Sequence, residues 1–430
     1  MAFDTSVTAI DAILKDDYQG PVREQLNSAT VFLKRVAKNT KDFHGRRVII
    51  PLHKGRNIGV GAASENGALP AAGNQQYDKS VWDVRQLYGT IQLTGLAMES
   101  AKSNVGSFIK GLDSEMKGLA KDLKVDQNRQ LWHDGSGLLT NATAATSATI
   151  TVDSTKFLAV GTLVQPAVLA DGSSPGTARS VASITSSTVV VLSGSTAVPA
   201  AGGLFKTGSR DLSDTTTAKI RYEVFGLEAL VSASNAGNGL GTAAGEDGLI
   251  GQITRTGNAW WQANSLLNGG TVRPLTLDLM QNAFDLSEIE GDSVPGLILT
   301  NHAMKRRYAG LLVADKRYPA GGDITLDGGY SALEFNGTPL VADKDGTLTN
   351  TPSVLRRMYF LSMSSFEQQI LKDWSWLDAD GSILKMLPST VTSGIGTYKD
   401  SWVAYMGSYQ ELACTRPNSN CVLGDIDEAA

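Results

Sequence analysis

The feature that most constrains this chain is one long amphipathic segment, residues 105–132. Apolar residues recur along it at steps of three or four, the spacing that places them on one face of a helix. They are Val105, Phe108, Ile109, Leu112, Met116, Leu119, Ala120, Leu123 and Leu131. A helix of this length spans roughly 40 Å, whereas the helices of compact domains average about three turns. We therefore expect the segment to be a structural spine.

The size and composition of the chain predict more than one hydrophobic core. Its 430 residues exceed the size at which a single core stops growing, so two or three subdomains are expected. Charged residues make up only 19%, and the 45 glycines indicate many turns, hairpins and extended connections. Strands should therefore outnumber helices.

The charge balance and the cysteine count argue against several classes of protein. A net charge of -5 does not suit a sequence-specific DNA reader, which carries a strongly basic face. Cys414 and Cys421 are too few for a disulfide framework or a four-ligand zinc site, and a local bridge stays the alternative to two ordinary thiols. Asp4 stands where a secretory signal needs positive charge, and no apolar run approaches the roughly 18 residues that cross a bilayer. We expect a soluble protein made in a reducing cytoplasm.

The first hundred residues predict an arm followed by a long hairpin. Residues 1–42 mix short helical signals with polar breaks, and such an arm usually needs a partner. Segments 48–52 and 81–93 show the pattern of strands that pair. The loop between them would hold about 28 residues, a length that counts against the pairing unless the loop projects outward to bind something. The projecting loop is the interpretation that we adopt.

Residues 138–208 nearly lack charge. Short alternating runs such as ATITVDS and STVVVLSG are separated by Gly, Ser, Pro and Asp, which is typical of a small antiparallel sheet or barrel. A low-complexity linker is the alternative, but the alternation is more regular than disorder requires. We expect a β-rich insertion.

The remainder of the chain mixes helical and strand signals and predicts an α+β body. Helices are expected at 222–233, 275–286 and 302–311, and strands at 296–300, 333–342, 357–363 and 368–377. The residues from 382 to 423 again predict paired strands, and an acidic tail, 425–430, closes the chain.

No convergent set of titratable groups indicates catalysis. The four histidines lie far apart in the sequence, outside any HExxH or Cys/His ligand spacing, and no GxxxxGK[ST] or GxSxG motif occurs. The run GNGLG at 237–241 lacks the strand-to-helix context of a dinucleotide site. Asp343, Asp345 and Gly346 lack the closing Glu of a calcium loop and favour an Asp-Gly turn in a hairpin. We predict no catalytic residue, no metal site and no cofactor.

Two basic clusters remain. Candidates for contact between subunits lie at and near the predicted loop: Arg46, Arg47, Lys54, Arg56 and Asn57. The cations would pair with an acidic patch on a neighbouring copy, or else be solvated on an exposed hairpin, and both interpretations stay open. Lys305, Arg306 and Arg307 begin a predicted helix and are interpreted as a solvated face.

The order of these parts resembles the major capsid proteins of tailed bacteriophages, which have the Hong Kong 97-type fold. The stretches DSEMKGLAKDLKVDQNRQLWHDGSG, YSALEFNGTPLVADKD and YKDSWVAYMGSYQELACTRPNSNCVL carry the likeness. The resemblance implies an α+β fold in six parts. They are an N-terminal arm (1–42), an E-loop hairpin (43–103), a spine helix (104–137), a small β-rich insertion domain (138–212), an axial domain (213–370), and peripheral-domain strands with a tail (371–430). The minimal fold lacks the insertion.

The resemblance also implies a function. Such a protein would assemble with itself into hexamers and pentamers of an icosahedral shell, located in the virion and assembled in the host cytoplasm. The expected partners are a separate scaffolding protein, a portal, and dsDNA that is packaged without sequence specificity. A decoration protein is left open, and no membrane is expected. An encapsulin-like cellular compartment is the first alternative, and an enzyme with a β-rich binding module is the second. Cross-linking of subunits is not predicted.

Overall fold

The computed structural model describes most of the chain in two compact units, which we describe one at a time. The described residues are 31–40, 45–100, 111–169, 174–209, 221–232, 249–314, 324–326, 330–346, 357–378, 383–388 and 398–427. The larger unit is built on Ala29–Tyr88, Lys124–Ser375 and Gly407–Ala430, and the smaller on Gly89–Leu123 and Trp376–Met406. Among the described residues, the helices are too short or too polar to cross a membrane.

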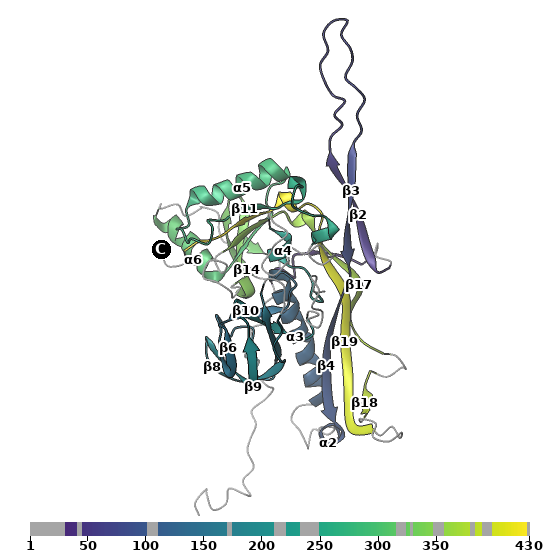
Figure 1. The fold of residues 1–430 in the computed structure, drawn as a ribbon, viewed down its shortest axis with the longest axis vertical. Helices are drawn as coiled ribbons and strands as arrows, with labels where there is room; N and C mark the ends of the chain where they lie inside the picture. Colours follow the sequence, from purple (N-terminus) through teal and green to yellow (C-terminus); the bar gives the residue numbers. More distant parts are fainter. Residues whose placement is uncertain are drawn as a thin grey trace, which may run out of the picture. The chain divides into compact units, whose positions relative to one another are not determined.

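A seven-stranded mixed sheet forms the body of the larger unit (Figure 1). Its order is β11-β20-β16-β12-β15-β14-β13, and β12 lies parallel to β15 and antiparallel to β16. The central strands β12 and β16 are buried at every position, which explains why their sequences, LILT and MYFL, show no alternation. The strands are β11 (Asn264–Leu266), β12 (Leu297–Thr300), β13 (Ile324–Leu326), β14 (Tyr330–Phe335), β15 (Thr338–Ala342), β16 (Met358–Leu361) and β20 (Cys421–Leu423).

Two helices cover one face of this sheet. Helix α5 (Leu277–Gly291) contributes Met280 and Phe284 to the shared core, and α6 (His302–Ala314) contributes Tyr308. Alternate sheet residues, such as Phe360 of β16, point into the same core. Because successive side chains of a strand point to opposite faces, the neighbours of these sheet residues line a second core on the other face.

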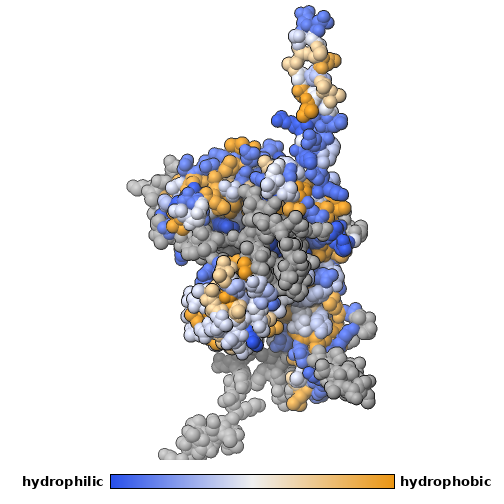
Figure 2. Space-filling model, in the orientation of Figure 1, coloured by the Kyte–Doolittle hydropathy of each residue, from blue (hydrophilic) through white to orange (hydrophobic). Residues whose placement is uncertain are grey.

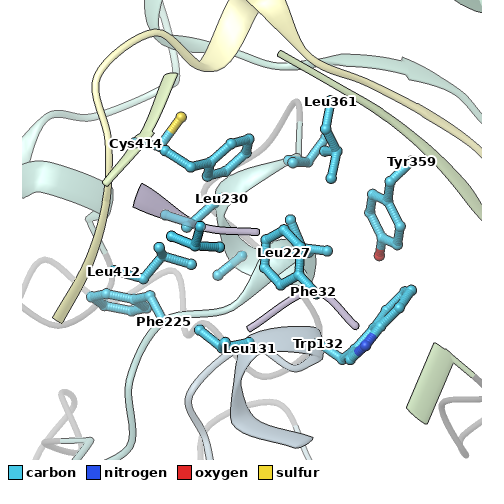
Figure 3. Close-up of a cluster of buried hydrophobic side chains, with 14 of the residues drawn as sticks. Phe32, Leu131, Trp132, Phe225, Leu227, Leu230, Tyr359, Leu361, Leu412 and Cys414 are labelled. Carbon is cyan, nitrogen blue, oxygen red and sulfur yellow. The ribbon is translucent and has the colours of Figure 1, made fainter. Parts of the chain in front are cut away.

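The second core joins segments that lie far apart in the sequence (Figure 3). Phe32 is fully buried and stacks edge-on against Phe366 at a centroid distance of 6.4 Å. Trp132, at the end of helix α3 (Gly111–Trp132), packs against Tyr359 of β16 at 5.9 Å. The side chains labelled in Figure 3 are Phe32, Leu131, Trp132, Phe225, Leu227, Leu230, Tyr359, Leu361, Leu412 and Cys414.

The charge-poor block forms a six-stranded antiparallel sheet with its own core, as predicted. Its order is β5-β10-β7-β8-β9-β6, and a bridge between Ala142 and Val152 links the two ends of this order. Leu138 on the first strand lies opposite Phe205 on the last, so the chain enters and leaves the sheet on neighbouring strands. The strands are β5 (Leu138–Ala142), β6 (Ala145–Thr151), β7 (Leu163–Val168), β8 (Arg179–Ser186), β9 (Val189–Val198) and β10 (Gly202–Lys206).

A further sheet has five strands. Its order is β1-β17-β19-β18, and β4 also pairs with β19. In the smaller unit, β4 lies close to α3, since a Cβ on Gly89 would be 2.9 Å from Leu119 and Leu123 side-chain carbons. The elements are β1 (Ala37–Asn39), β4 (Arg85–Thr94), β17 (Phe366–Trp376), β18 (Lys385–Pro388), β19 (Tyr398–Cys414) and helix α2 (Gly95–Ser100).

The predicted long helix is confirmed from residue 111 onward, as the 22 residues of α3. Residues 105–110 of the predicted segment lie outside the described residues. The 22 residues span roughly 33 Å at 1.5 Å per residue.

The predicted hairpin is confirmed only in its first part. Strands β2 (Arg47–Gly55) and β3 (Gln76–Asp83) pair antiparallel, with Val48 opposite Trp82. The prediction continued the return strand to residue 93, but β4 begins at Arg85 and pairs with β19 instead. Alternation shows which side of a strand is buried and not which strand it pairs with. The same alternating pattern therefore continues from β3 into β4, although the two strands belong to different sheets.

Three other local predictions were wrong. The single strand expected at 333–342 is a hairpin of β14 and β15, in which Phe335 lies opposite Thr338. The helix expected at 222–233 is reduced to α4 (Leu227–Leu230). All four of its residues are buried, so the apolar residues of this segment do not form one face of an amphipathic helix. The hairpin turn expected at Asp343 and Asp345 is a 3-10 helix (Lys344–Gly346), because both carboxylates bind buried polar partners. The other 3-10 helices are η3 (Ile250–Gln252), η4 (Ala259–Trp261), η6 (Met363–Ser365) and η7 (Pro417–Ser419).

Candidate assembly surface

The β2–β3 ribbon is anchored by one face only. Val48, Ile50 and Leu52 pack against the second core, and buried Trp82 donates its indole N–H to Ser80 Oγ at 3.1 Å. The opposite face of the ribbon leaves apolar side chains in solvent, among them Ile49 and Tyr77. The ribbon is therefore fixed at one side and open at the other.

Beyond the strands, residues 56–75, which we call the distal loop, run as two close backbone segments (Figure 1). A Cβ on Gly59 would lie 2.8 Å from both the Gly73 nitrogen and the Ala71 oxygen, so glycine permits this approach. Asn57 Oδ1 accepts a hydrogen bond from the Gly59 N–H at 2.7 Å. The Gly67 N–H donates to Ser64 O at 2.9 Å and closes a turn at the tip.

The distal loop exposes large apolar side chains. Ile58 is 82% exposed, Val60 86% and Leu69 84%, and Arg56 and Glu65 are the charged residues of the loop. Figure 2 shows hydrophobic residues along this loop beside polar ones. Contiguous exposed apolar surface is uncommon on monomeric proteins and is typical of contact with another molecule. The loop therefore has the chemistry of a binding element.

The structure places the five candidate contact residues in two separate groups. Arg46 and Arg47 lie at the start of β2, whereas Lys54 lies near its end, roughly 24 Å away at 3.4 Å per residue. Arg56 and Asn57 follow in the distal loop. The two groups therefore do not form one charged cluster.

Two of the four cations are paired within the ribbon. Arg47 Nε lies 2.5 Å from Asp83 Oδ1, and Lys54 Nζ lies 2.9 Å from Asp78 Oδ2. The hydrogen bond from Lys54 holds the pKa of Asp78 below its usual value. Arg46 and Arg56 are exposed and have no ion pair within the described part of the chain. Whether these residues contact a neighbouring copy stays a prediction.

Sequence reasoning missed a buried polar junction. Asn128 of α3 donates its amide to Asp345 Oδ2 at 2.7 Å and to Asp343 Oδ1 at 3.3 Å. Asp343 Oδ2 also accepts from the Val31 N–H at 3.2 Å. The junction therefore ties the segment beginning at residue 31 to the spine helix and to β15. Asn128 is not one of the apolar residues that predicted the spine helix, and its partner Asp343 is 215 residues away.

One buried and one half-exposed ion pair form a second set of links in the larger unit. Arg129 Nη2 lies 2.6 Å from Glu223 Oε1 in the buried pair, and Lys206 Nζ lies 3.0 Å from Asp126 Oδ2 in the half-exposed pair, which joins α3 to β10. The buried pair is costly to break, because the remaining partner stays charged and buried. These contacts hold elements together and show no nucleophile beside a base.

A further buried pair links the first residue of β4 to β19. Arg85 Nε lies 3.3 Å from Glu411 Oε2, and Glu411 Oε1 accepts from the Phe225 N–H at 2.9 Å. Burial raises the pKa of Glu411 to about 7 against the opposing effect of Arg85.

The structure also shows the state of the two cysteines and whether side chains are grouped to bind a metal ion. Cys414 and Cys421 are both free and buried, which decides for ordinary thiols over a bridge. Within the described residues, no group of three or more His, Cys, Asp or Glu side chains is placed to hold a metal ion.

Comparison with solved structures finds the same fold over nearly the whole chain. The capsid asymmetric unit of cyanophage A-1(L) matches with a TM-score of 0.59 and 13% identity, covering 98% of each chain. The capsid of a native GTA particle matches at 0.51 and 11% identity, covering 98% of this chain and 99% of that one. The holo-SrpI encapsulin complex from Synechococcus elongatus PCC 7942 matches at 0.47 and 10%, covering 100% and 98%. No family model and no curated protein matches the sequence.

These matches confirm the α+β, Hong Kong 97-type fold predicted from the order of the parts. The chain has the fold of phage capsid proteins.

Proposed function

We propose that this chain, with the fold of phage capsid proteins, is the major capsid protein of a tailed dsDNA bacteriophage. It assembles with itself into hexamers and pentamers of an icosahedral shell. The observation that supports this most strongly is the match to a phage capsid structure over 98% of both chains. A match of that coverage includes the ribbon and the long strands as well as the body, so the whole architecture is of the capsid type.

The distal loop supplies the means of assembly in this proposal. A loop with no core of its own becomes ordered on a neighbouring subunit, where buried apolar surface stabilises the contact by about 25 cal/mol per Å². Ile58, Val60 and Leu69 are the side chains available for that burial. Arg46 and Arg56 then pair with carboxylates of the neighbour, while Arg47 and Lys54 hold the ribbon together.

The parts of the chain take the corresponding roles. Residues 43–103 contain the E-loop, 104–137 the spine helix, 138–212 the insertion domain and 213–370 the axial domain. Residues 1–42 serve as an arm, and residues 371–430 return to the peripheral domain.

The proposed partners follow from the same role. A separate scaffolding protein guides assembly in the host cytoplasm, a portal occupies one vertex, and dsDNA is packaged without sequence specificity. A decoration protein is a further candidate partner. The role is structural, without catalysis, and the higher scores of the phage and GTA capsids favour a virion shell over an encapsulin-like compartment.

Electron microscopy of the purified full chain, concentrated with polyethylene glycol as a crowding agent, tests the proposal. Closed shells or five- and six-membered rings are expected. A variant in which a short Gly-Ser linker replaces residues 57–74 should keep the thermal transition of the wild type, since the loop is exposed, and should form no shells. Normal shells from that variant would remove the loop from the mechanism, and a wild type that stays monomeric would refute the proposed function.

A further inference from the structure

The last turn of helix α5 carries negative charge where a helix disfavours it. Glu288 and Glu290 are exposed there, Asp292 follows as the left-handed C-cap, and the turn has no basic residue. The C-terminal end of a helix has a partial negative charge, so carboxylates at that end are unfavourable. Within the part of the chain that the structure describes, these three carboxylates have no ion pair. We call them the acidic end of α5.

The backbone of this end is held rigidly by neutral groups. Asn264 donates its side-chain amide to Leu286 O at 3.2 Å, and Asn418 donates its amide to Glu290 O at 2.9 Å. Amides thus satisfy the terminal carbonyls that Lys or Arg side chains often bind. Beside the carboxylates, Ile289 is 74% exposed and Val294 58%. The acidic end therefore combines fixed charge with exposed apolar surface.

The start of helix α6 carries the opposite charge. His302 and Arg306 are exposed on one side of the helix, Arg307 follows Arg306 in the second turn, and the first turn has no acidic residue. The N-terminal end of a helix has a partial positive charge, and no carboxylate of the first turn offsets it here. Arg307 Nε is buried and has no hydrogen-bond partner in the described structure. We call these residues the basic end of α6; the sequence pattern alone indicated no more than a solvated face.

The two helix ends lie beside opposite ends of strand β12, in the middle of the seven-stranded sheet. Just past α5, Ser293 Oγ is 2.7 Å from Ser362 Oγ, which follows the last residue of β16. Just before α6, Thr300 Oγ1 donates to Arg357 O, at the other end of β16. The length of β12 separates these two helix ends by roughly 13 Å at 3.3 Å per residue. The ends therefore do not neutralise each other within one subunit.

We propose that the acidic end of α5 on one subunit contacts the basic end of α6 on a second copy of this chain. This contact rests on the proposed function. The last turn of α5 departs from the local charge preference of a helix, and the exposed basic residues at the start of α6 are complementary to it in sign, which is expected of surfaces selected for binding. A contact between two different surfaces of identical copies is head-to-tail, and it closes into a ring when the rotation between copies permits.

The contact gives each group a suitable partner. Glu288 and Glu290 accept hydrogen bonds from the guanidinium groups of Arg306 and Arg307. Ile289 and Val294 lose their exposure to water. Complementary charge chiefly sets the register of such a contact and the rate at which it forms.

Charge reversal at each end tests the contact. The acidic-end variant carries Glu288→Lys and Glu290→Lys, the basic-end variant carries His302→Glu and Arg306→Glu, and a swapped variant carries all four. Each single-end variant should need about tenfold or more protein to assemble, because like charges then face each other. The swapped variant should recover assembly with itself. Glu115→Lys, an exposed reversal on α3, serves as the control and should assemble as the wild type does.

Mixing the two single-end variants gives a sharper result. Their unlike ends match only when the variants alternate around a ring, and alternation requires an even number of subunits. Electron microscopy should therefore show six-membered rings and no five-membered rings from the equimolar mixture.

Thermal unfolding of the unassembled subunits separates lost contact from lost folding. Lysine near the C-terminal end of α5 suits the helix dipole, so the acidic-end variant should unfold at a higher temperature than the wild type. Single-end variants that assemble like the wild type would overturn the contact, and so would a folded swapped variant that fails to assemble. A wild type that forms no assembly in the same assay would instead overturn the proposed function on which the contact rests.

Discussion

Replacing Ile58, Val60 and Leu69 of the distal loop by serine should weaken assembly without weakening the fold. The three side chains are 82%, 86% and 84% exposed, so the isolated subunit gains little from them. Full burial of one such side chain is worth about 1.5 to 3 kcal/mol, and half burial of all three is therefore worth about 3 kcal/mol per subunit. At 1.4 kcal/mol per factor of ten, the concentration needed for assembly should rise by about a hundredfold.

Light scattering against protein concentration measures the onset of assembly, and calorimetry of the unassembled subunit measures its folding. Val160→Ser with Leu163→Ser provides the matched control, because both side chains are large, apolar and exposed, but lie at the start of β7 and in the turn before it. The reasoning is refuted if the triple variant assembles at the wild-type concentration. It also fails if the variant unfolds several degrees earlier, since the loop would then belong to the subunit's own core.

Three further predictions concern the fold. Because the pKa of Glu411 rises from 4.5 to about 7 on folding, the native state holds this proton more tightly than the unfolded state does. The folding free energy therefore loses up to about 3 kcal/mol as pH rises from 4.5 through 7. The urea midpoint of Glu411→Gln, relative to that of the wild type, should therefore increase as pH rises from 5 to 8. Buried His133 has a lowered pKa and the opposite slope, which cancels in that difference. Gly226→Ala should abolish soluble protein on expression, because a Cβ there collides with backbone carbonyls at the end of α3. Phe32→Ala should cost about 3 to 5 kcal/mol in denaturant unfolding, as for other large buried aromatics, and a cost below 1 would remove Phe32 from the core.

The parts of the fold that depend on local periodicity could be predicted from the sequence. Helices α5 and α6 were expected within a few residues of their observed bounds, because each has one apolar face and a recognisable start. Strands β12, β16 and β17 were expected at 296–300, 357–363 and 368–377, where short apolar runs occur, whereas the single strand expected at 333–342 is the hairpin of β14 and β15. The order of these elements was then enough to identify the fold family.

Pairing over long sequence distance could not be predicted. The pattern of residues 81–93 is the same whether the partner is β2 or β19, and β19 lies some three hundred residues further along. The burial of Asp343 depends likewise on Asn128, and no local signal in either segment marks the other.

The candidate assembly surface was predicted in outline and not in its groups. Sequence reasoning found the loop from its length and its basic residues, whereas its exposed chemistry is largely apolar. Arg47 and Lys54 were interpreted either as contacts to a neighbour or as solvated side chains, and in the structure Asp83 and Asp78 face them across the ribbon. Only the register of β2 against β3 reveals that pairing.

The six-stranded sheet has a consequence for engineering and for evolution. Its first and last strands are hydrogen-bonded neighbours, and the Lys206 N–H donates to Gly137 O at 2.9 Å. The chain therefore enters and leaves the sheet at adjacent positions. A segment attached in this way can be excised, or exchanged for a foreign sequence of another length, while the flanking chain is rejoined by a short linker. Gain or loss of such a module would preserve the path of the flanking chain at the cost of the Lys206–Asp126 pair to α3, which suits this position to peptide display.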